Sequence, residues 1–271
     1  MTKLRKQLLT KLYVIPNYEC NLNCPHCDLH KKKVTFNEDL FYATLNSIEA
    51  DEVILFGGEP TLYKDRLLAC LETNKVTSIS TNLLDEDRID LFAKYDLDIA
   101  TSWNPHRFNK FQQSLWINNL YHLSKLNKQA LILITLTPDL LKFSKEDLYN
   151  LFNTLEILGI SGILFEPLVS SHTNQEFYNK CDNWLCELYK DWRWGFNNFI
   201  IDKLDNWNCN CSGIKTLEPN GILKNGCPQV EGNIQINIRC FSCFFSSICN
   251  PCYLQKYCAF PKNLYKLVKE K

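Results

Sequence analysis

The sequence lacks an excess of charge of either sign. Lysine and arginine together number 30, and so do aspartate and glutamate, so the formal net charge is zero. A protein that binds nucleic acid usually carries a basic excess or a concentrated basic stripe. The only basic run here is Lys31-Lys32-Lys33, which is more typical of a solvated turn. We therefore do not expect nucleic acid among the partners of this protein.

Long apolar segments are also missing. No apolar run approaches the roughly 20 residues that cross a membrane. The basic N-terminal residues Met1–Lys11 lack the apolar stretch of a signal peptide. The chain has 271 residues, 45% of them hydrophobic, which suffices for the core of one large domain or of one large and one small domain. We expect a soluble, cytoplasmic protein with no membrane partner.

Cysteine, in contrast, is abundant. The chain has 14 cysteines, of which three lie within residues 20–27 and eight lie between residues 209 and 258. In a reducing cytosol, clusters of this kind are more typical of metal ligands than of disulfides.

Six short apolar runs alternate with six amphipathic stretches. The runs have the length and the Val, Ile and Leu content of buried parallel strands, and they are Leu12–Tyr18, Glu52–Phe56, Val76–Thr81, Leu97–Trp103, Ala130–Thr137 and Gly162–Val169. The stretches have helical spacing, and they are Asn37–Glu49, Tyr63–Thr73, Asp85–Tyr95, Gln112–Leu126, Ser144–Leu158 and Gln175–Trp192. Six strand–helix repeats predict an α/β fold of parallel strands wound into a barrel or a partial (β/α)6 barrel, whose ligands gather at the carboxyl ends.

The pattern changes after about Trp194. Residues 195–258 contain polar stretches, turn residues and cysteines but little apolar material, so metal could order this segment. We expect a soft boundary near residues 195–205, with a barrel domain over residues 10–195 and a small cysteine-rich, metal-ordered domain over residues 196–271.

The first cysteine group has the spacing Cys-x3-Cys-x2-Cys and consists of Cys20, Cys24 and Cys27. Three thiolates can hold three irons of a four-iron, four-sulfur cluster and leave the fourth iron open to another ligand. Zinc is the alternative, because His26 or His30 would complete a four-ligand site. The spacing favours iron and sulfur over zinc.

A glycine-rich motif, Gly57-Gly58-Glu59-Pro60, follows the second expected strand. Two glycines allow a close approach of the backbone to a ligand, and the carboxylate beside them can pair with an ammonium group. Alone, this motif would favour a tight turn with an exposed glutamate.

Together, the cysteine triad after the first strand and the glycine motif after the second resemble the radical S-adenosylmethionine (SAM) superfamily. The resemblance covers about residues 10–195. It implies that a [4Fe-4S] cluster on the triad binds SAM, that the glycine motif contacts the SAM amino group, and that SAM cleavage gives a 5′-deoxyadenosyl radical that removes a substrate hydrogen. Weaker expected SAM contacts, also implied by the resemblance, are Thr81, Asn82, Ser102 and Leu168.

The C-terminal cysteines resemble the SPASM extension of radical SAM enzymes, which implies two auxiliary [4Fe-4S] clusters and three clusters in all. That family's interleaved ligation implies one cluster on Cys209, Cys211, Cys227 and Cys252, and a second on Cys240, Cys243, Cys249 and Cys258. Cys211, Gly221 and Cys227 match a hairpin of that extension, with one extra residue after Gly221, and Cys252 comes one residue early. Pro228 stands where sulfatase-maturing members carry an aspartate base, which argues against formylglycine formation.

The resemblance implies an oxidoreductase-type enzyme that makes a cross-link or a dehydrogenation in a peptide or peptide-like substrate, with the auxiliary clusters accepting electrons. The resemblance also implies one partner, an electron donor such as flavodoxin or ferredoxin. Because only about eleven residues precede the first strand, we expect a separate leader-peptide recognition protein or a small-molecule substrate. The alternatives are a redox-neutral epimerisation or rearrangement, and a zinc-binding module without catalysis.

Overall fold

The structure of the chain is a computed structural model that describes residues 11–27, 29, 32–168, 174–191, 207–208, 214–225, 249–250, 263–264 and 267. The expected domain boundary near residues 195–205 lies outside these residues and stays a prediction. The described residues divide into two compact units. The first unit contains residues 11–23, 27–99 and 214–225, and the second contains residues 24–26 and 100–191 with the remaining short segments.

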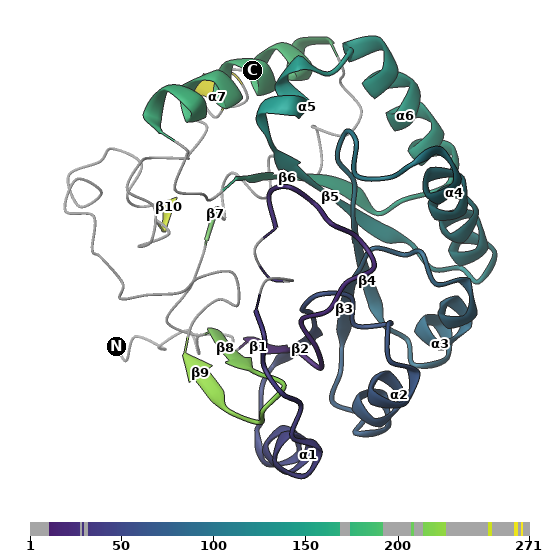
Figure 1. Ribbon diagram of the computed structural model, residues 1–271. Coiled ribbons are helices and arrows are strands. Elements are labelled where there is room, and N and C mark those ends of the chain that lie inside the picture. The colour runs from purple at the N-terminus through teal and green to yellow at the C-terminus, as the bar shows by residue number, and fades with distance from the viewer. Residues whose placement is uncertain are drawn as a thin grey trace, which may run out of the picture. The chain divides into compact units, whose positions relative to one another are not determined.

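The first unit is a sheet with the strand order β3-β2-β1-β8-β9. β1 (Lys11–Val14), β2 (Glu52–Leu55) and β3 (Ser78–Thr81) are parallel, and each alternates half-buried with buried residues. β8 (Ile214–Leu217) lies parallel to β1 on its other side, and β9 (Leu223–Asn225) pairs with β8 as a hairpin (Figure 1). The hairpin of β8 and β9 therefore belongs to the same sheet as β1, the first strand of the described residues.

Helices follow each of the first three strands: α1 (Glu38–Ser47), α2 (Lys64–Glu72) and, after a short 3-10 turn η2 (Glu86–Arg88), α3 (Ile89–Lys94). α1 begins where the Asn37 side chain accepts a hydrogen bond from the Leu40 amide, with two acidic residues in the first turn. Side chains buried completely in this unit include Val14, Phe41, Leu45, Leu55, Leu67 and Ile79.

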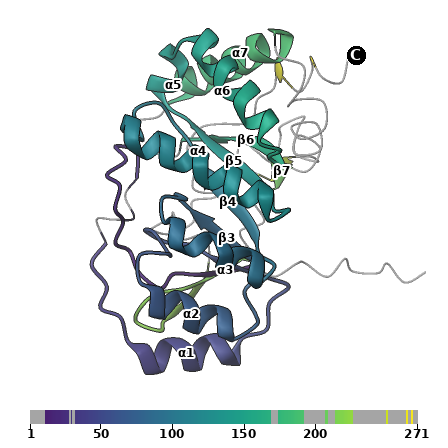
Figure 2. The ribbon, with the colours of Figure 1, turned by 90° about the vertical axis from the view of Figure 1, so that its right-hand side faces the viewer.

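The second unit contains β4 (Asp98–Ser102, which begins in the first unit), α4 (Lys110–Lys125), β5 (Ala130–Leu136), α5 (Pro138–Lys142), α6 (Lys145–Ile157), β6 (Gly162–Pro167) and α7 (Gln175–Asp191). α4 and α6 lie along one face of these strands (Figure 2). β5 and β6 are parallel. Two short strands, β7 (Trp207–Asn208) and β10 (Cys249–Asn250), also pair with each other.

The six predicted strands and six predicted helices all exist, and most boundaries agree within two or three residues. The predicted start of α6 is confirmed, because the Ser144 hydroxyl accepts a hydrogen bond from the Asp147 amide, and Gly159 follows the helix with φ at 70°. The pattern missed α5, a single turn in which Thr137 caps a helix that starts at Pro138. No described helix is long and apolar enough to cross a membrane.

Candidate functional site

The first cysteine group lies in the loop that follows the carboxyl end of β1, residues 15–27, which we call the cysteine loop. None of its three thiols forms a disulfide; Cys20 and Cys27 are half-buried and Cys24 is buried. The Cys20 sulfur accepts a hydrogen bond from the Leu22 amide at 3.4 Å. Three reduced thiols in one short loop are a donor set that suits an iron–sulfur cluster.

Residues 56–63, which we call the glycine loop, run directly against the cysteine loop. The Gly58 amide donates to the Asn17 carbonyl at 3.1 Å, and the Glu59 amide donates to the Glu19 carbonyl at 2.7 Å. The Asn17 side-chain amide donates a hydrogen bond to the Glu59 carbonyl at 3.1 Å. Two backbone hydrogen bonds and one side-chain hydrogen bond thus connect the loop after β1 to the loop after β2.

The two glycines make this contact possible. A Cβ atom on Gly58 would lie 2.0 Å from the Glu19 carbonyl oxygen, and one on Gly57 would lie 2.5 Å from the Asn17 carbonyl oxygen. Gly57 also has φ at 133°, which side chains rarely tolerate. The glycines are therefore needed because the backbone of the cysteine loop occupies the space where their side chains would be.

Glu59 is not an exposed turn residue, as the motif alone would suggest, because only 1% of its surface is accessible. One carboxylate oxygen accepts bonds from the Thr61 amide (3.1 Å), the Thr61 hydroxyl (2.8 Å) and the Thr81 hydroxyl (2.7 Å). The other accepts the Asn82 amide at 2.7 Å. Burial raises the pKa of this carboxyl group, and the four donors act in the opposite direction. Glu59 thus links the loops after β2 and β3.

Asn82 extends this network to the cysteine loop. Its side-chain amide donates to the Asn21 side-chain oxygen at 2.6 Å and lies 4.0 Å from the Cys20 sulfur. Its own oxygen accepts the Leu84 amide at 3.0 Å. With the buried Pro60 and Thr81, the structure brings most of the expected cofactor-binding residues of the first unit into one place beside Cys20.

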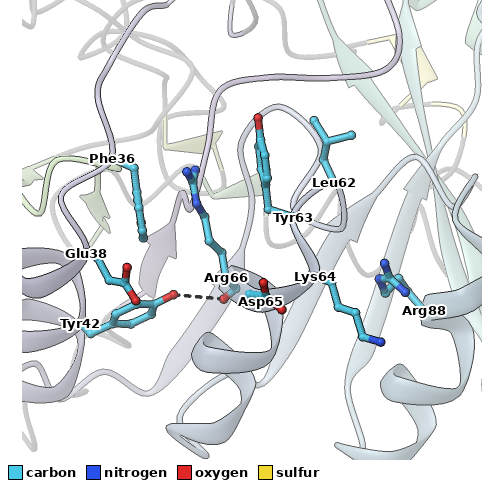
Figure 3. Close-up of a pocket in the computed structure, with 9 residues that line it drawn as sticks. All are labelled: Phe36, Glu38, Tyr42, Leu62, Tyr63, Lys64, Asp65, Arg66 and Arg88. Atoms are coloured by element: carbon cyan, nitrogen blue, oxygen red, sulfur yellow. Dashed lines mark hydrogen bonds between the residues drawn. The ribbon is translucent and has the colours of Figure 1, made fainter.

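A second set of contacts to the cysteine loop comes from the start of α2. The Tyr63 hydroxyl donates to the Glu19 carboxylate at 2.5 Å, and the Arg66 guanidinium donates to the Pro16 carbonyl at 3.2 Å. The guanidinium lies between two rings, 4.0 Å from the centre of Phe36 and 4.4 Å from that of Tyr63 (Figure 3). Phe36, Tyr63 and Arg66 line a pocket of about 400 Å³.

The other expected SAM contacts belong to the second unit. Ser102 is half-buried at the end of β4, beside the buried Thr101, which accepts a hydrogen bond from the Trp116 indole at 3.0 Å. Leu168 is half-buried after β6, and its carbonyl accepts the Tyr178 hydroxyl at 2.9 Å. Their roles in SAM binding stay predictions.

Most of the C-terminal cysteines lie outside the described residues: Cys209, Cys211, Cys227, Cys240, Cys243, Cys252 and Cys258. Of Cys249 only the backbone is described, in β10. The hairpin itself is described, with Gly221 at its turn and φ at 80°. The expected auxiliary clusters and the assignment of these cysteines to them stay predictions.

Two observations bear on whether the loop fits its expected cofactors. Within the described part of the chain, no three His, Cys, Asp or Glu side chains converge on a point that would hold a single metal ion. A four-iron cluster differs, since each cysteine binds a different iron and the sulfurs lie farther apart. The Asn17 side-chain oxygen is buried and has no hydrogen-bond partner, so it can accept an N–H group of a ligand.

Sequence reasoning missed Asn17, Glu19 and Asn21. All three lie on the cysteine loop, and their polar character beside a ligand motif was the available signal. His26, the fourth ligand of the zinc alternative, has a pKa lowered first by burial and then by the positive charge of Arg107.

Comparisons with known proteins agree on the fold. Streptococcus suis SuiB bound to S-adenosylmethionine matches with a TM-score of 0.64 and 17% identity over 92% of this chain and 75% of SuiB. The protein anSMEcpe, bound to AdoMet and the Kp18Cys peptide, matches with a TM-score of 0.65 and 16% identity over 96% of this chain and 95% of its own. SuiB bound to its precursor peptide SuiA also matches, with a TM-score of 0.58 and 15% identity, over 97% of this chain and 67% of SuiB.

Among curated proteins, MJ1227 of Methanocaldococcus jannaschii, named for the activation of a glycyl-radical enzyme, is 36% identical over 61 residues. The matched segment is 20% of this chain and spans only a quarter of the length of that relative. No family profile matches the chain. The fold is that of the radical SAM partial barrels, which confirms the fold class predicted from the sequence.

Proposed function

We propose that this protein is a radical SAM enzyme that oxidatively modifies a peptide or a peptide-like substrate. The observation that carries the proposal is the contact of the cysteine loop with the glycine loop and Asn82, which gathers Cys20, Gly57, Gly58 and Glu59 at the carboxyl ends of adjacent parallel strands. Ligands of α/β folds bind at such strand ends.

In this proposal Cys20, Cys24 and Cys27 hold a [4Fe-4S] cluster, and SAM binds at its open iron beside the glycine loop. When bound, the cluster and SAM supply the electron and the 5′-deoxyadenosyl group that remove a substrate hydrogen. The protein itself would hold the cluster and SAM and orient them. The four donors on Glu59 leave its carboxylate no free oxygen, so we infer that Glu59 fixes the loops. Asn17, with its unpartnered oxygen, is the better acceptor for an ammonium group.

A peptide substrate is supported by the relatives of the same fold, because anSMEcpe was solved with a peptide and SuiB with a precursor peptide. The C-terminal cysteines would hold two auxiliary clusters that take up the second electron of the oxidation. An external one-electron donor, such as flavodoxin or ferredoxin, would reduce the SAM-binding cluster. A separate leader-peptide recognition protein would present the substrate.

The test is anaerobic reconstitution followed by iron, zinc and sulfide analysis and an assay for 5′-deoxyadenosine. We expect on the order of 12 irons and 12 sulfides per chain, from three four-iron clusters. Replacing Cys20, Cys24 and Cys27 together by Ala should abolish 5′-deoxyadenosine and leave about two thirds of the iron. Cys70→Ala is the matched control, because Cys70 is a free, buried cysteine of α2 outside the site.

Zinc without acid-labile sulfide would refute the proposal and support the binding module. Formation of 5′-deoxyadenosine by the triple variant would refute the role of the triad. Product analysis with a candidate peptide then decides the reaction: a mass loss of two hydrogens indicates oxidation, whereas an unchanged mass with incorporation of solvent deuterium indicates epimerisation.

A further inference from the structure

The C-terminal hairpin is attached to the strand that leads into the cysteine loop. β8 pairs with β1 along its whole length, from Lys11↔Ile214 to Val14↔Leu217, and the Ile15 amide continues the ladder to the Leu217 carbonyl at 2.9 Å. At the hairpin turn, a Cβ atom on Gly221 would lie within 2.8 Å of the Leu40 backbone. The turn is thus fixed against α1.

A buried carboxylate at this turn contacts the cysteine loop directly. Glu218 is 5% exposed, and one of its oxygens accepts the Tyr18 hydroxyl at 2.9 Å. The same oxygen forms an ion pair with Lys224 of β9 at 2.7 Å. Tyr18 is 4% exposed, and its ring packs with Ile15 and Leu29 while the Lys32 ammonium lies 5.4 Å from its centre. Tyr18 and Glu218 are 200 residues apart in the sequence.

We propose that Glu218 is a positioning residue for the cysteine loop, acting through the hydroxyl of Tyr18. Tyr18 lies two residues before Cys20 in the sequence. Its two neighbours, Asn17 and Glu19, supply the carbonyls that accept hydrogen bonds from the glycine loop. The C-terminal hairpin thereby sets where Cys20 stands relative to Gly58 and Glu59. The inference rests on the proposed function only for the consequence at the cluster, because the contact itself belongs to the chain without cofactors.

Hydrogen exchange of the cofactor-free protein tests the contact. The amides of Gly58 and Glu59 donate to the cysteine loop, so their exchange reports when that loop moves away. Tyr18→Phe removes the hydroxyl without changing the packing, and Glu218→Leu removes the acceptor. We expect each to speed the exchange of these two amides by about tenfold, as the loss of one hydrogen bond to a charged group implies.

The double variant should be no faster than Glu218→Leu alone, because the bond that Tyr18→Phe removes is already absent in that variant. Glu218→Gln keeps an acceptor for Tyr18 and should exchange at nearly the wild-type rate. Thr77→Val is the matched control: it removes a hydroxyl that donates to the Val53 carbonyl at 3.1 Å near the amino ends of β2 and β3, away from the cysteine loop. Unchanged exchange in Tyr18→Phe would overturn the proposal, and so would additive effects in the double variant.

The reconstituted protein tests the consequence. Tyr18→Phe should raise the KM for SAM several-fold, leave kcat within twofold, and alter the electron paramagnetic resonance spectrum of the reduced cluster. Glu218→Gln, which keeps the acceptor, should leave the KM and the spectrum close to those of the wild type. A lower melting temperature with an unchanged KM and spectrum would reduce Glu218 to a structural role and refute the inference. If the wild type assembled no cluster, the proposed function would fail while the exchange result would still decide the contact.

Discussion

Gly58→Ala should separate the glycine loop from the cysteine loop. The new Cβ would lie 2.0 Å from the Glu19 carbonyl oxygen and 2.5 Å from the carbonyl carbons of Tyr18 and Glu19, all of them backbone atoms that cannot rotate away. The two loops must therefore move apart by about 1 Å or more. This movement breaks the bond from the Glu59 amide to Glu19 and that from the Gly58 amide to Asn17.

The expected cost follows from these contacts. Overpacking of a filled site costs about 1–3 kcal/mol, and two lost hydrogen bonds cost about 1 kcal/mol each. We expect the free energy of unfolding to fall by roughly 3–5 kcal/mol, a large part of the total for a domain of ordinary stability, about 5–15 kcal/mol. Iron incorporation should fall with it, because Cys20 loses its position.

Gly159→Ala is the matched control. Gly159 also has a positive φ, 70°, but its Cβ would meet nothing nearer than the Gln129 side chain at 4.0 Å. Only the backbone strain of a left-handed residue remains, about 1–2 kcal/mol. Urea unfolding of the cofactor-free proteins, followed by circular dichroism, measures both. If Gly58→Ala cost no more than Gly159→Ala, the argument that the two loops need a glycine at their contact would be wrong.

Three further predictions concern single side chains. Glu59→Gln should cost about 2–4 kcal/mol, because an amide donor would replace an acceptor that faces four donors. Alkylation of the native protein at pH 8, mapped by mass spectrometry, should leave Cys70 and Cys181 almost unlabelled. The reason is that burial raises the pKa of each thiol to about 12. Rapid labelling of either cysteine would contradict its burial. Arg66→Lys should lower the melting temperature nearly as much as Arg66→Gln, because an ammonium group cannot stack between two rings as a guanidinium does; full stability of the lysine variant would show that charge alone is needed.

The elements of the fold were predictable because the barrel strands are short, apolar and separated by amphipathic helices. Hydrophobic periodicity is a local signal, and it located all six strands and six helices. α5 was missed because one helical turn is too short to show a period; only the Thr137 cap and Pro138 marked it. The hairpin of β8 and β9 has few apolar residues, so periodicity alone did not locate it. The resemblance of its glycine and flanking cysteines to a known extension did.

The candidate site was predictable in its residue types and less so in their roles. The triad and the glycine motif could be read from spacing, and their neighbourhood follows from adjacent parallel strands. Their roles depend on contacts between distant segments. Nothing in Gly57-Gly58-Glu59-Pro60 reveals that the glycines accommodate the backbone of residues 17–19, or that Glu59 faces inward to four donors.

By itself, the sequence determined the order of strands and helices, the loop that carries the cysteine triad and the class of fold, because these follow from local patterns of side chains. Tertiary structure alone decided that the hairpin at residues 214–225 lies beside β1 and that Glu218 contacts Tyr18. The physical reason is that a sheet edge accepts any strand whose backbone groups are free, so which strand pairs with β1 is decided by burial and packing across about 200 residues of chain and not by local pattern.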